Sequence, residues 1–124
     1  MNGVILKQAQ IAHADERRTI LPICNGDFTA KQIKIIEVKK GNILGNHCHR
    51  YKEIRYMFKG RANYFLEDYY THEKSNMNME QGDIMITDPW IVHAAEFIED
   101  SIMIEGTEEA YWSAEKNDIF KNIR

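Results

Sequence analysis

The strongest constraint on the fold of this chain is a short segment in which two histidines and a glutamate stand at fixed distances between two glycines. The segment covers residues 41–60 and has the spacing G-x5-H-x-H-x3-E-x6-G, with His47, His49 and Glu53 at its fixed polar positions. Side chains alternate along a strand, so His47 and His49 share one face and Cys48 points to the other. The spacing therefore predicts two imidazoles directed into one interior, with a structural thiol at Cys48.

A second segment supplies one more histidine, because Gly82 is followed by His93 eleven residues later. Together the two segments resemble the two motifs of the cupin family, the second of which reads G-x5-P-x-G-x2-H-x3-N. Asp88, Trp90 and Phe97 replace the Pro, Gly and Asn of that motif. The position of the histidine is kept, so the resemblance implies a cupin whose second loop has its own shape.

The cupin resemblance implies a metal ion bound by His47, His49, Glu53 and His93. Three neutral imidazoles and one carboxylate suit divalent iron, manganese, nickel, cobalt, zinc or copper. Four protein ligands leave two adjacent positions of an octahedral ion open, where a substrate could bind. The alternative is a cupin barrel without a metal, in which these histidines are ordinary half-buried residues.

Short runs of β-branched residues between turn residues predict an all-β chain. Strands are expected over residues 31–39, 45–49, 53–58, 61–67, 84–87, 91–98 and 101–105. Residues 68–80 are polar and are expected to form a loop in their middle, with a turn at Ser75. The pattern fits the jelly-roll barrel, or double-stranded β-helix, of the cupins. A short C-terminal helix is predicted over residues 113–123, with Ser113 as its N-cap.

The bulk properties predict a single cytoplasmic domain over residues 1–124, with a net charge of −3. Basic residues are spread along the chain, which argues against a nucleic-acid partner. Apolar runs are only a few residues long, whereas a membrane span needs roughly 20, so no membrane partner is expected. The N-terminus lacks the pattern of a signal peptide. A cytoplasmic chain also favours free thiols at Cys24 and Cys48.

Alternation from Glu53 places Arg55 and Met57 inside the barrel as well. A buried arginine needs an anionic or oxygen-rich partner, because an unpaired charge is costly to bury. Two interpretations stay open. Arg55 either clamps a substrate or forms an internal ion pair, for example with Glu37 or Glu96.

Four further residues are expected around the site. Ala95 and Phe97 follow His93 inward by the same alternation and would form an apolar wall of the pocket. Tyr51 and Trp90 flank the motifs in turns and are candidates for the mouth, although aromatic residues more often simply pack.

The outer face of the strand that begins at Glu53 carries Ile54, Tyr56 and Phe58, an apolar stripe that should not meet water. It should pack either on a further part of the sheet or on a second subunit. Cupins commonly dimerise through their N-terminal strands, so the resemblance implies a homodimer with residues 4–6 at the contact.

Part of the chain also resembles the cupin keto-sugar isomerases of deoxysugar and polysaccharide biosynthesis. The segments concerned are residues 15–21, 28–31 and 44–49. Those enzymes carry D-x-R-G-x-L, F-x-x-K/R and R-G-x-H-A-H, and they act on nucleotide-linked 4-keto sugars without a metal. The resemblance implies an acid/base role for His49 and a phosphate or pocket role for Arg17. The departures from these patterns lie at Arg18, Leu44 and Glu53.

These features predict an enzyme, a metal-dependent cupin that acts on a small oxygenated substrate, with a sugar derivative as a candidate. A Lewis-acid metal would stabilise an enediolate and permit isomerisation or epimerisation, whereas Fe(II) would permit a dioxygenase reaction. His49 and Arg55 are the candidate catalytic residues. The alternative is a non-catalytic cupin module that binds a small ligand. The native metal, the substrate and the reaction stay open, because one fold hosts many chemistries.

Overall fold

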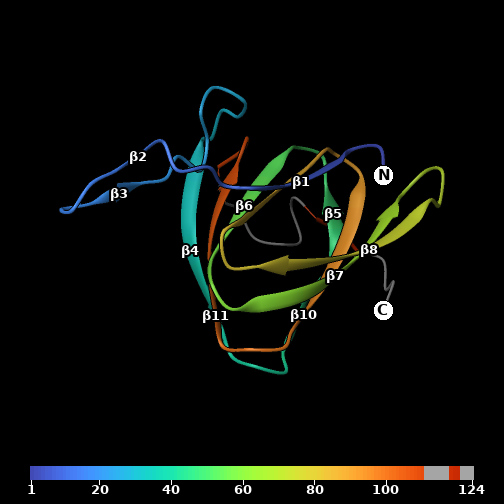
Figure 1. Ribbon diagram of the computed structural model, residues 1–124. Helices are drawn as coiled ribbons and strands as arrows, with labels where there is room; N and C mark the ends of the chain where they lie inside the picture. Colours follow the sequence, from blue (N-terminus) through green and yellow to red (C-terminus); the bar gives the residue numbers. More distant parts are fainter. Residues whose placement is uncertain (111–117, 121–124) are drawn as a thin grey trace.

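The structure of the protein is a computed structural model that describes residues 1–110 and 118–120. Within these residues the chain forms twelve strands and no helix. Ten of the strands form two five-stranded antiparallel sheets that face each other across a common core (Figure 1). None of the described residues belongs to a helix that could span a bilayer.

The first sheet has the strand order β1-β9-β6-β11-β4. Its strands are β1 (Val4–Gln8), β9 (Asp83–Thr87), β6 (Glu53–Lys59), β11 (Ser101–Thr107) and β4 (Gln32–Val38). The second sheet has the order β12-β5-β10-β7-β8. Its strands are β12 (Asp118–Phe120), β5 (Ile43–His49), β10 (Ile91–Phe97), β7 (Arg61–Asp68) and β8 (Lys74–Glu80).

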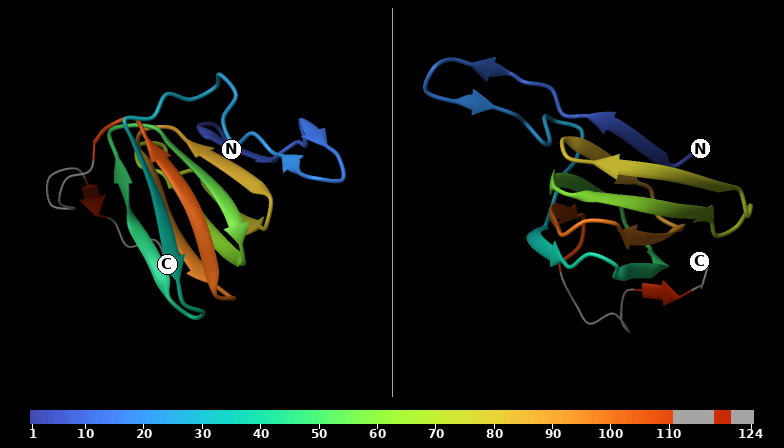
Figure 2. Two further views of the ribbon diagram at one scale, coloured as in Figure 1. Left: turned by 90° about the vertical axis from the view of Figure 1, so that its left-hand side faces the viewer. Right: turned by 60° about the horizontal axis from the view of Figure 1, so that its bottom comes forward.

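A separate hairpin of β2 (His13–Ala14) and β3 (Thr19–Ile20) projects away from the two sheets (Figure 2). This hairpin was not predicted from the sequence. All seven strands that were predicted are present, with ends shifted by one or two residues.

Residues 74–80 form a strand, β8, so the loop expected in the middle of this region is wrong. β8 pairs with β7 at the edge of the second sheet, with Met79 opposite Ala62. Asn76 and Asn78 are exposed, whereas Met79 is fully buried. Polar residues with low strand propensity are tolerated here because they face water on an edge strand and their neighbours face the core.

The C-terminal helix predicted over residues 113–123 is wrong for residues 118–120, which form β12. The rest of that helix lies outside the described residues. β12 pairs with β5, placing Asp118 opposite His49 and Phe120 opposite His47. An isolated helix of this length is marginal in water, while the edge of β5 offers a complete row of backbone hydrogen-bonding groups.

The core between the two sheets is apolar and rich in methionine. It consists of Val38, Met57, Ala62, Tyr64, Leu66, Met79, Met85, Ile91, Ala95, Phe97 and Met103. Ala95 and Phe97 therefore lie inside, as their alternation with His93 predicts. Cys48 is fully buried and Cys24 is exposed, and both are free thiols.

A smaller apolar cluster lies on the outer face of the first sheet, around Ile54 and Tyr56. These two side chains are buried against the segment that leads from the hairpin to β4, which includes Leu21 and Phe28. The apolar stripe is therefore covered largely by the same chain, although Phe58 stays 54% exposed. β1 pairs with β9 of its own sheet. The homodimer stays a prediction.

A β-bulge at Gly45 and Asn46 sets the direction of the histidines on β5. His47 pairs with His93, but the next pair joins Ala94 to Gly45, so Asn46 is the extra residue. Both bulge residues have positive φ, 101° and 60°. A β-carbon at Gly45 would clash with the carbonyl oxygen of His93, so only glycine fits there. The bulge shifts the alternation of β5 just before the motif histidines.

Candidate active site

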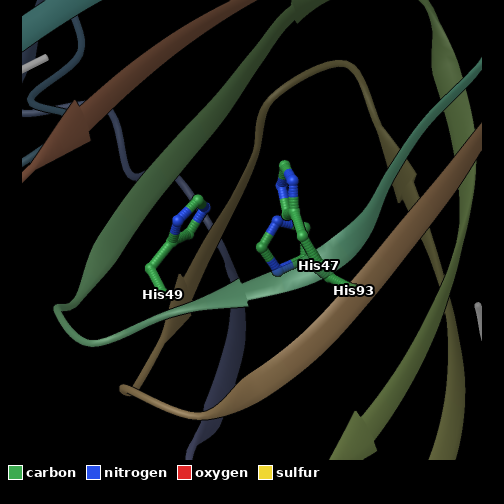
Figure 3. A group of neighbouring side chains, drawn as sticks. All are labelled: His47, His49 and His93. Atoms are coloured by element: carbon green, nitrogen blue, oxygen red, sulfur yellow. The ribbon is translucent and has the colours of Figure 1, made fainter. Parts of the chain in front are cut away.

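Three imidazoles meet on the inner side of β5 and β10. His47 and His49 extend from β5 and His93 from β10, on the same side of the ribbon (Figure 3). The centroid of the His47 ring lies 4.6 Å from that of His49 and 4.7 Å from that of His93. The structure thus brings the histidines of both motifs into one cluster, in which one nitrogen from each ring lies within 4.8 Å of the others.

Glu53, at the start of β6, joins this cluster through one carboxylate oxygen. Its Oε1 lies 3.1 Å from Nε2 of His49 and 3.7 Å from Nε2 of His93. Burial opposes ionisation of Glu53, but the charge of Arg55 and the hydrogen bond from His49 hold its pKa well below the usual range. Glu53 is therefore a buried carboxylate.

Arg55 lies beside Glu53 and is almost completely buried, with 1% of its surface exposed. Its Nη2 donates to Glu53 Oε1 at 2.8 Å, and its Nη1 donates to Thr87 Oγ1 at 3.0 Å. Its Nε lies 3.4 Å from Oε2 of Glu105, which faces Arg55 across the pair β6 and β11. Arg55 thus forms an internal ion-pair network with Glu53 and Glu105. Neither partner proposed from the sequence, Glu37 or Glu96, takes that role.

The contacts of Arg55 also determine the state of His93. Nη2 of Arg55 lies 3.2 Å from Nε2 of His93, and an arginine can only donate. Nε2 of His93 therefore accepts, and its Nδ1 donates to the carbonyl oxygen of Ile91 at 3.2 Å. Burial and the positive charge of Arg55 hold the pKa of His93 well below its usual value, so this ring is neutral.

His49 has the opposite arrangement. A carboxylate can only accept, so Nε2 of His49 donates to Glu53 and the lone pair of the ring lies on Nδ1. The Tyr51 ring stacks on His49, with centroids 4.8 Å apart and planes inclined by 20°. This pairing of a buried carboxylate with an imidazole orients His49 and would stabilise it after it takes up a proton.

The predicted metal ligands fit an ion only in part. The nitrogens of His47, His49 and His93 form a group that could hold one. Glu53, however, directs its carboxylate to Arg55, and Nε2 of His93 accepts a hydrogen bond from the same guanidinium. Two of the four donors are thus engaged by a permanent cation, and the four-ligand arrangement is not formed. Metal binding stays a prediction.

An aromatic surface consists of Trp90, Tyr69 and Tyr70 and is joined to β5 by a backbone hydrogen bond from Trp90 to His49. Trp90 has a φ of 69°, a backbone conformation that bulky residues rarely adopt. It stands where the cupin motif has glycine, so the loop keeps the glycine-type backbone although the side chain has changed. Backbone hydrogen bonds hold it there: the Trp90 amide donates to the carbonyl of His49, and the Tyr69 amide donates to that of Trp90, both at 2.9 Å.

The ring of Trp90 contacts the other members of this surface. Its centroid lies 5.5 Å from that of Tyr69 and 5.1 Å from that of Tyr70, and the guanidinium carbon of Arg50 lies 5.7 Å from the Trp90 ring. Tyr70 is 64% exposed. Trp90 was predicted from the sequence to lie at the mouth of the pocket, but the two tyrosines were not. Two adjacent tyrosines in a polar turn are the sequence feature that could have indicated them.

Arg17 is not brought to this site within the chain. It lies in the turn of the projecting hairpin, where its Nη2 is 3.3 Å from Oδ2 of Asp15 (Figures 1 and 2). Thr87 and Glu105, by contrast, belong to the network around Arg55 and were missed. Alternation along their own strands, the rule that placed Arg55 inside, is the sequence feature that could have indicated them.

No protein-family model matches this sequence, and no curated protein matches it. Solved structures do match its fold. The sugar 3,4-ketoisomerase QdtA of Thermoanaerobacterium thermosaccharolyticum, in complex with TDP, superposes with a TM-score of 0.80 at 18% identity, over 99% of this chain and 90% of that chain. The dTDP-4-dehydrorhamnose 3,5-epimerase of Sulfolobus tokodaii gives 0.82 at 18% identity, over 97% and 77%.

ChmJ, a 3'-monoepimerase of Streptomyces bikiniensis in complex with dTDP-quinovose, gives a TM-score of 0.82 at 13% identity, over 98% of this chain and 70% of that chain. Together with the two facing sheets, these matches confirm the predicted fold class. The chain has the cupin jelly-roll fold. At these identities the likeness concerns the fold alone, and it agrees with the part of the sequence that resembles the cupin keto-sugar isomerases.

Proposed function

We propose that this protein is an isomerase or epimerase that moves a proton on a keto sugar, with His49 as the general base. The observation that carries this proposal is the hydrogen bond of 3.1 Å between Nε2 of His49 and Oε1 of Glu53. Both residues are buried, with 8% and 3% of their surfaces exposed. A carboxylate that fixes one imidazole nitrogen leaves the other, Nδ1, as an oriented base. Nδ1 of His49 is buried, so on this proposal a local opening of the site admits the substrate.

The reaction follows from elementary carbonyl chemistry. The lone pair on Nδ1 of His49 takes the proton from the carbon next to the ketone, and the electrons of that C–H bond form an enolate. The resulting imidazolium is stabilised by Glu53. Return of the proton to the other face of the same carbon gives an epimer. Where the carbon that loses its proton carries a hydroxyl, the intermediate is an enediolate, and protonation of the former carbonyl carbon with loss of the hydroxyl proton moves the ketone to the neighbouring carbon. Neither outcome needs an oxidant or reductant.

Arg55 takes no direct part in these steps, because its donors are engaged inside the protein. It holds Glu53 ionised and keeps Nε2 of His93 as an acceptor. His47 is the least buried of the three imidazoles. It is therefore the ring best placed to donate a proton to the enolate oxygen.

The substrate class we propose is a nucleotide-linked keto sugar. Flat rings stack well on Trp and Tyr, and the aromatic surface of Trp90, Tyr69 and Tyr70 offers such rings next to the backbone of His49. Arg50, which lies over Trp90, supplies a positive charge suited to a phosphate. Two of the solved structures with the same fold hold TDP or dTDP-quinovose, which supports this choice.

The test is proton exchange. The protein is mixed in D2O with TDP-4-keto-6-deoxyglucose, and NMR follows deuterium incorporation at the carbons beside the ketone. We expect His49→Gln to slow this exchange by about 10²–10⁴-fold, the usual contribution of a positioned base. His13→Gln is the matched control, because His13 lies in the projecting hairpin. Binding of TDP without exchange in the wild-type protein would instead support the non-catalytic binding module.

A metal-dependent reaction is the second candidate, favoured by the grouping of the three imidazole nitrogens within 4.8 Å. A bound ion would act as a Lewis acid on the substrate oxygens, and iron would also allow chemistry with dioxygen. Elemental analysis of tag-free protein, purified without added metal, tests this candidate. A stoichiometric ion whose removal abolishes exchange would favour it over the proposal above.

A further inference from the structure

Arg55 places a permanent positive charge among the predicted metal ligands. Its Nη2 lies 2.8 Å from Oε1 of Glu53 and 3.2 Å from Nε2 of His93, so it uses a lone pair on two of the four donors. The same guanidinium also contacts Thr87 and Glu105. These contacts come from three different strands besides its own, β9, β10 and β11.

We propose that Arg55 is a built-in cation that takes the place of a metal ion in this cluster. On this proposal the wild-type protein keeps His47, His49, Glu53 and His93 free of metal. Removing the guanidinium would then convert the same four residues into a site for one divalent cation of the first transition series. The proposal does not depend on the reaction proposed above.

Arginine stays protonated under all ordinary conditions, so a divalent ion held by Glu53 and His93 would lie beside a fixed positive charge in a poorly screened interior. The ion would also have to displace the guanidinium from the lone pairs that it needs. Both effects weaken metal binding while Arg55 stays in position.

Burial explains why Arg55 stays there. Its side chain is 2% exposed, and those of Glu53 and Glu105 are 4% and 9% exposed. Movement of the guanidinium toward solvent would leave the buried Glu53 without its arginine counter-charge, which is strongly unfavourable, and would leave Glu105 paired with Lys34. The cation is thus held by the same network that it neutralises.

The donor chemistry supports the second half of the proposal. With the guanidinium gone, the three imidazole nitrogens within 4.8 Å of one another remain, and Oε1 of Glu53 lies 3.1 Å from His49 and 3.7 Å from His93. One carboxylate and three imidazoles are a donor set that suits Co²⁺, Ni²⁺ and Zn²⁺. A metal would also restore the positive charge that Glu53 loses with Arg55. The ion should therefore stabilise the variant much more than the wild-type protein.

The experiment is a Co²⁺ titration of tag-free, chelator-treated protein, followed by visible absorption and by calorimetry. The proteins compared are the wild type, Arg55→Met, Arg55→Met/Glu105→Gln and Arg55→Lys. We expect both methionine variants to bind one equivalent of Co²⁺ about 10–100-fold more tightly than the wild type, the range by which changes beside a metal site commonly shift affinity. Arg55→Lys is the matched control: it keeps a cation and should stay metal-free.

Two results would overturn the proposal. One is a wild-type protein that binds an equivalent of Co²⁺ as tightly as the variants, and the other is a folded methionine variant that binds none. The double variant also removes the Glu105 carboxylate, which in Arg55→Met loses its arginine partner and keeps Lys34, so it guards against simple unfolding. If neither methionine variant folds, the Co²⁺ titration of the wild type is the test. Binding of one equivalent of Co²⁺ overturns the proposal, and no binding supports it. Adding His93→Gln to Arg55→Met should abolish binding, which assigns the ion to this cluster.

Discussion

The interior of the barrel has two halves that share the same strands and differ in chemistry. On four strands, a buried polar side chain in one half lies two or four residues along the strand from a buried apolar side chain in the other half. The pairs are Arg55 and Met57 on β6, Thr87 and Met85 on β9, Glu105 and Met103 on β11, and His93 and Phe97 on β10. Both members of each pair are buried. We call them the charged half and the methionine half.

The two halves contribute to stability in different ways. The methionine half gains free energy from removing apolar surface from water, and Met57, Met79, Met85 and Phe97 have no exposed surface at all. The charged half gains little in this way, because desolvation of Arg55 and its carboxylates offsets much of their attraction. Its value lies in placing ionised and neutral groups at set positions. The same alternation thus builds a stabilising layer and a reactive layer.

The largest effect on stability is expected when the charged half loses its cation. Arg55→Met leaves Glu53 buried without its arginine counter-charge and leaves Glu105 paired with Lys34, 3.2 Å from its Oε1, and breaking a buried pair costs about 3–5 kcal/mol. Urea unfolding with chelator present measures this loss. Arg55→Met/Glu105→Gln should recover part of it. A loss under about 1 kcal/mol would mean that water reaches this half freely and that the contrast between the halves is wrong.

The methionine half should respond to a change of volume. Met57→Ala removes a fully buried side chain and should cost about 2–5 kcal/mol through the cavity it leaves. Met57→Leu is the matched control and should cost less than about 1.5 kcal/mol, since it conserves volume. Proton exchange on a keto sugar should persist in both proteins below their melting temperatures. Exchange lost in Met57→Leu would show that the halves are not independent.

Outside the interior, Trp90 tests the link between strain and binding. Trp90 is strained because a bulky residue has a positive φ there, and Trp90→Gly relieves this strain of about 1–3 kcal/mol. The same change removes the ring contacts with Tyr69 and Tyr70. Stability should therefore change by less than about 1 kcal/mol. Affinity for TDP should fall by about 1–3 kcal/mol if the base stacks there.

Calorimetry with TDP measures this change in affinity, and Phe58→Ala serves as the control. Phe58 is an exposed aromatic residue on β6 of the first sheet, whereas Trp90 is half-buried. A Trp90→Gly protein that binds TDP like the wild type would remove the aromatic surface from the proposed substrate site.

Much of the fold could be predicted from the sequence, because seven strands have clear alternation or β-branched runs. The clustering of the three histidines followed from motif spacing. The partners of Arg55 could not be predicted, since they depend on the register between β6 and β11, which shifts between Ile102 and Met103. β12 was missed because its pairing partner, the edge of β5, lies about seventy residues away in the chain and is not visible in a local pattern.

The smallest effect is expected for an exposed ion pair, which gives a reference for the buried one. Lys7 Nζ lies 2.7 Å from Asp27 Oδ2, much like the 2.8 Å between Arg55 and Glu53, but its side chains are 45% and 39% exposed. The hydrogen bond from Lys7 lowers the pKa of Asp27 from 3.8 to about 2. Because this pKa is depressed on folding, the stabilisation is present above pH 3.8 and is lost as the pH falls toward about 2.

Solvent screening limits the size of this contribution, so Asp27→Asn should lower the free energy of unfolding at pH 7 by only about 0.2–1 kcal/mol. The difference between Asp27→Asn and the wild type should shrink in urea unfolding at pH 3, and it should also shrink in high salt. The loss in Arg55→Met should be nearly insensitive to salt, because its partners are buried. An equal salt dependence for both variants would show that burial does not distinguish these two ion pairs, and the contrast drawn from the barrel interior would then fail.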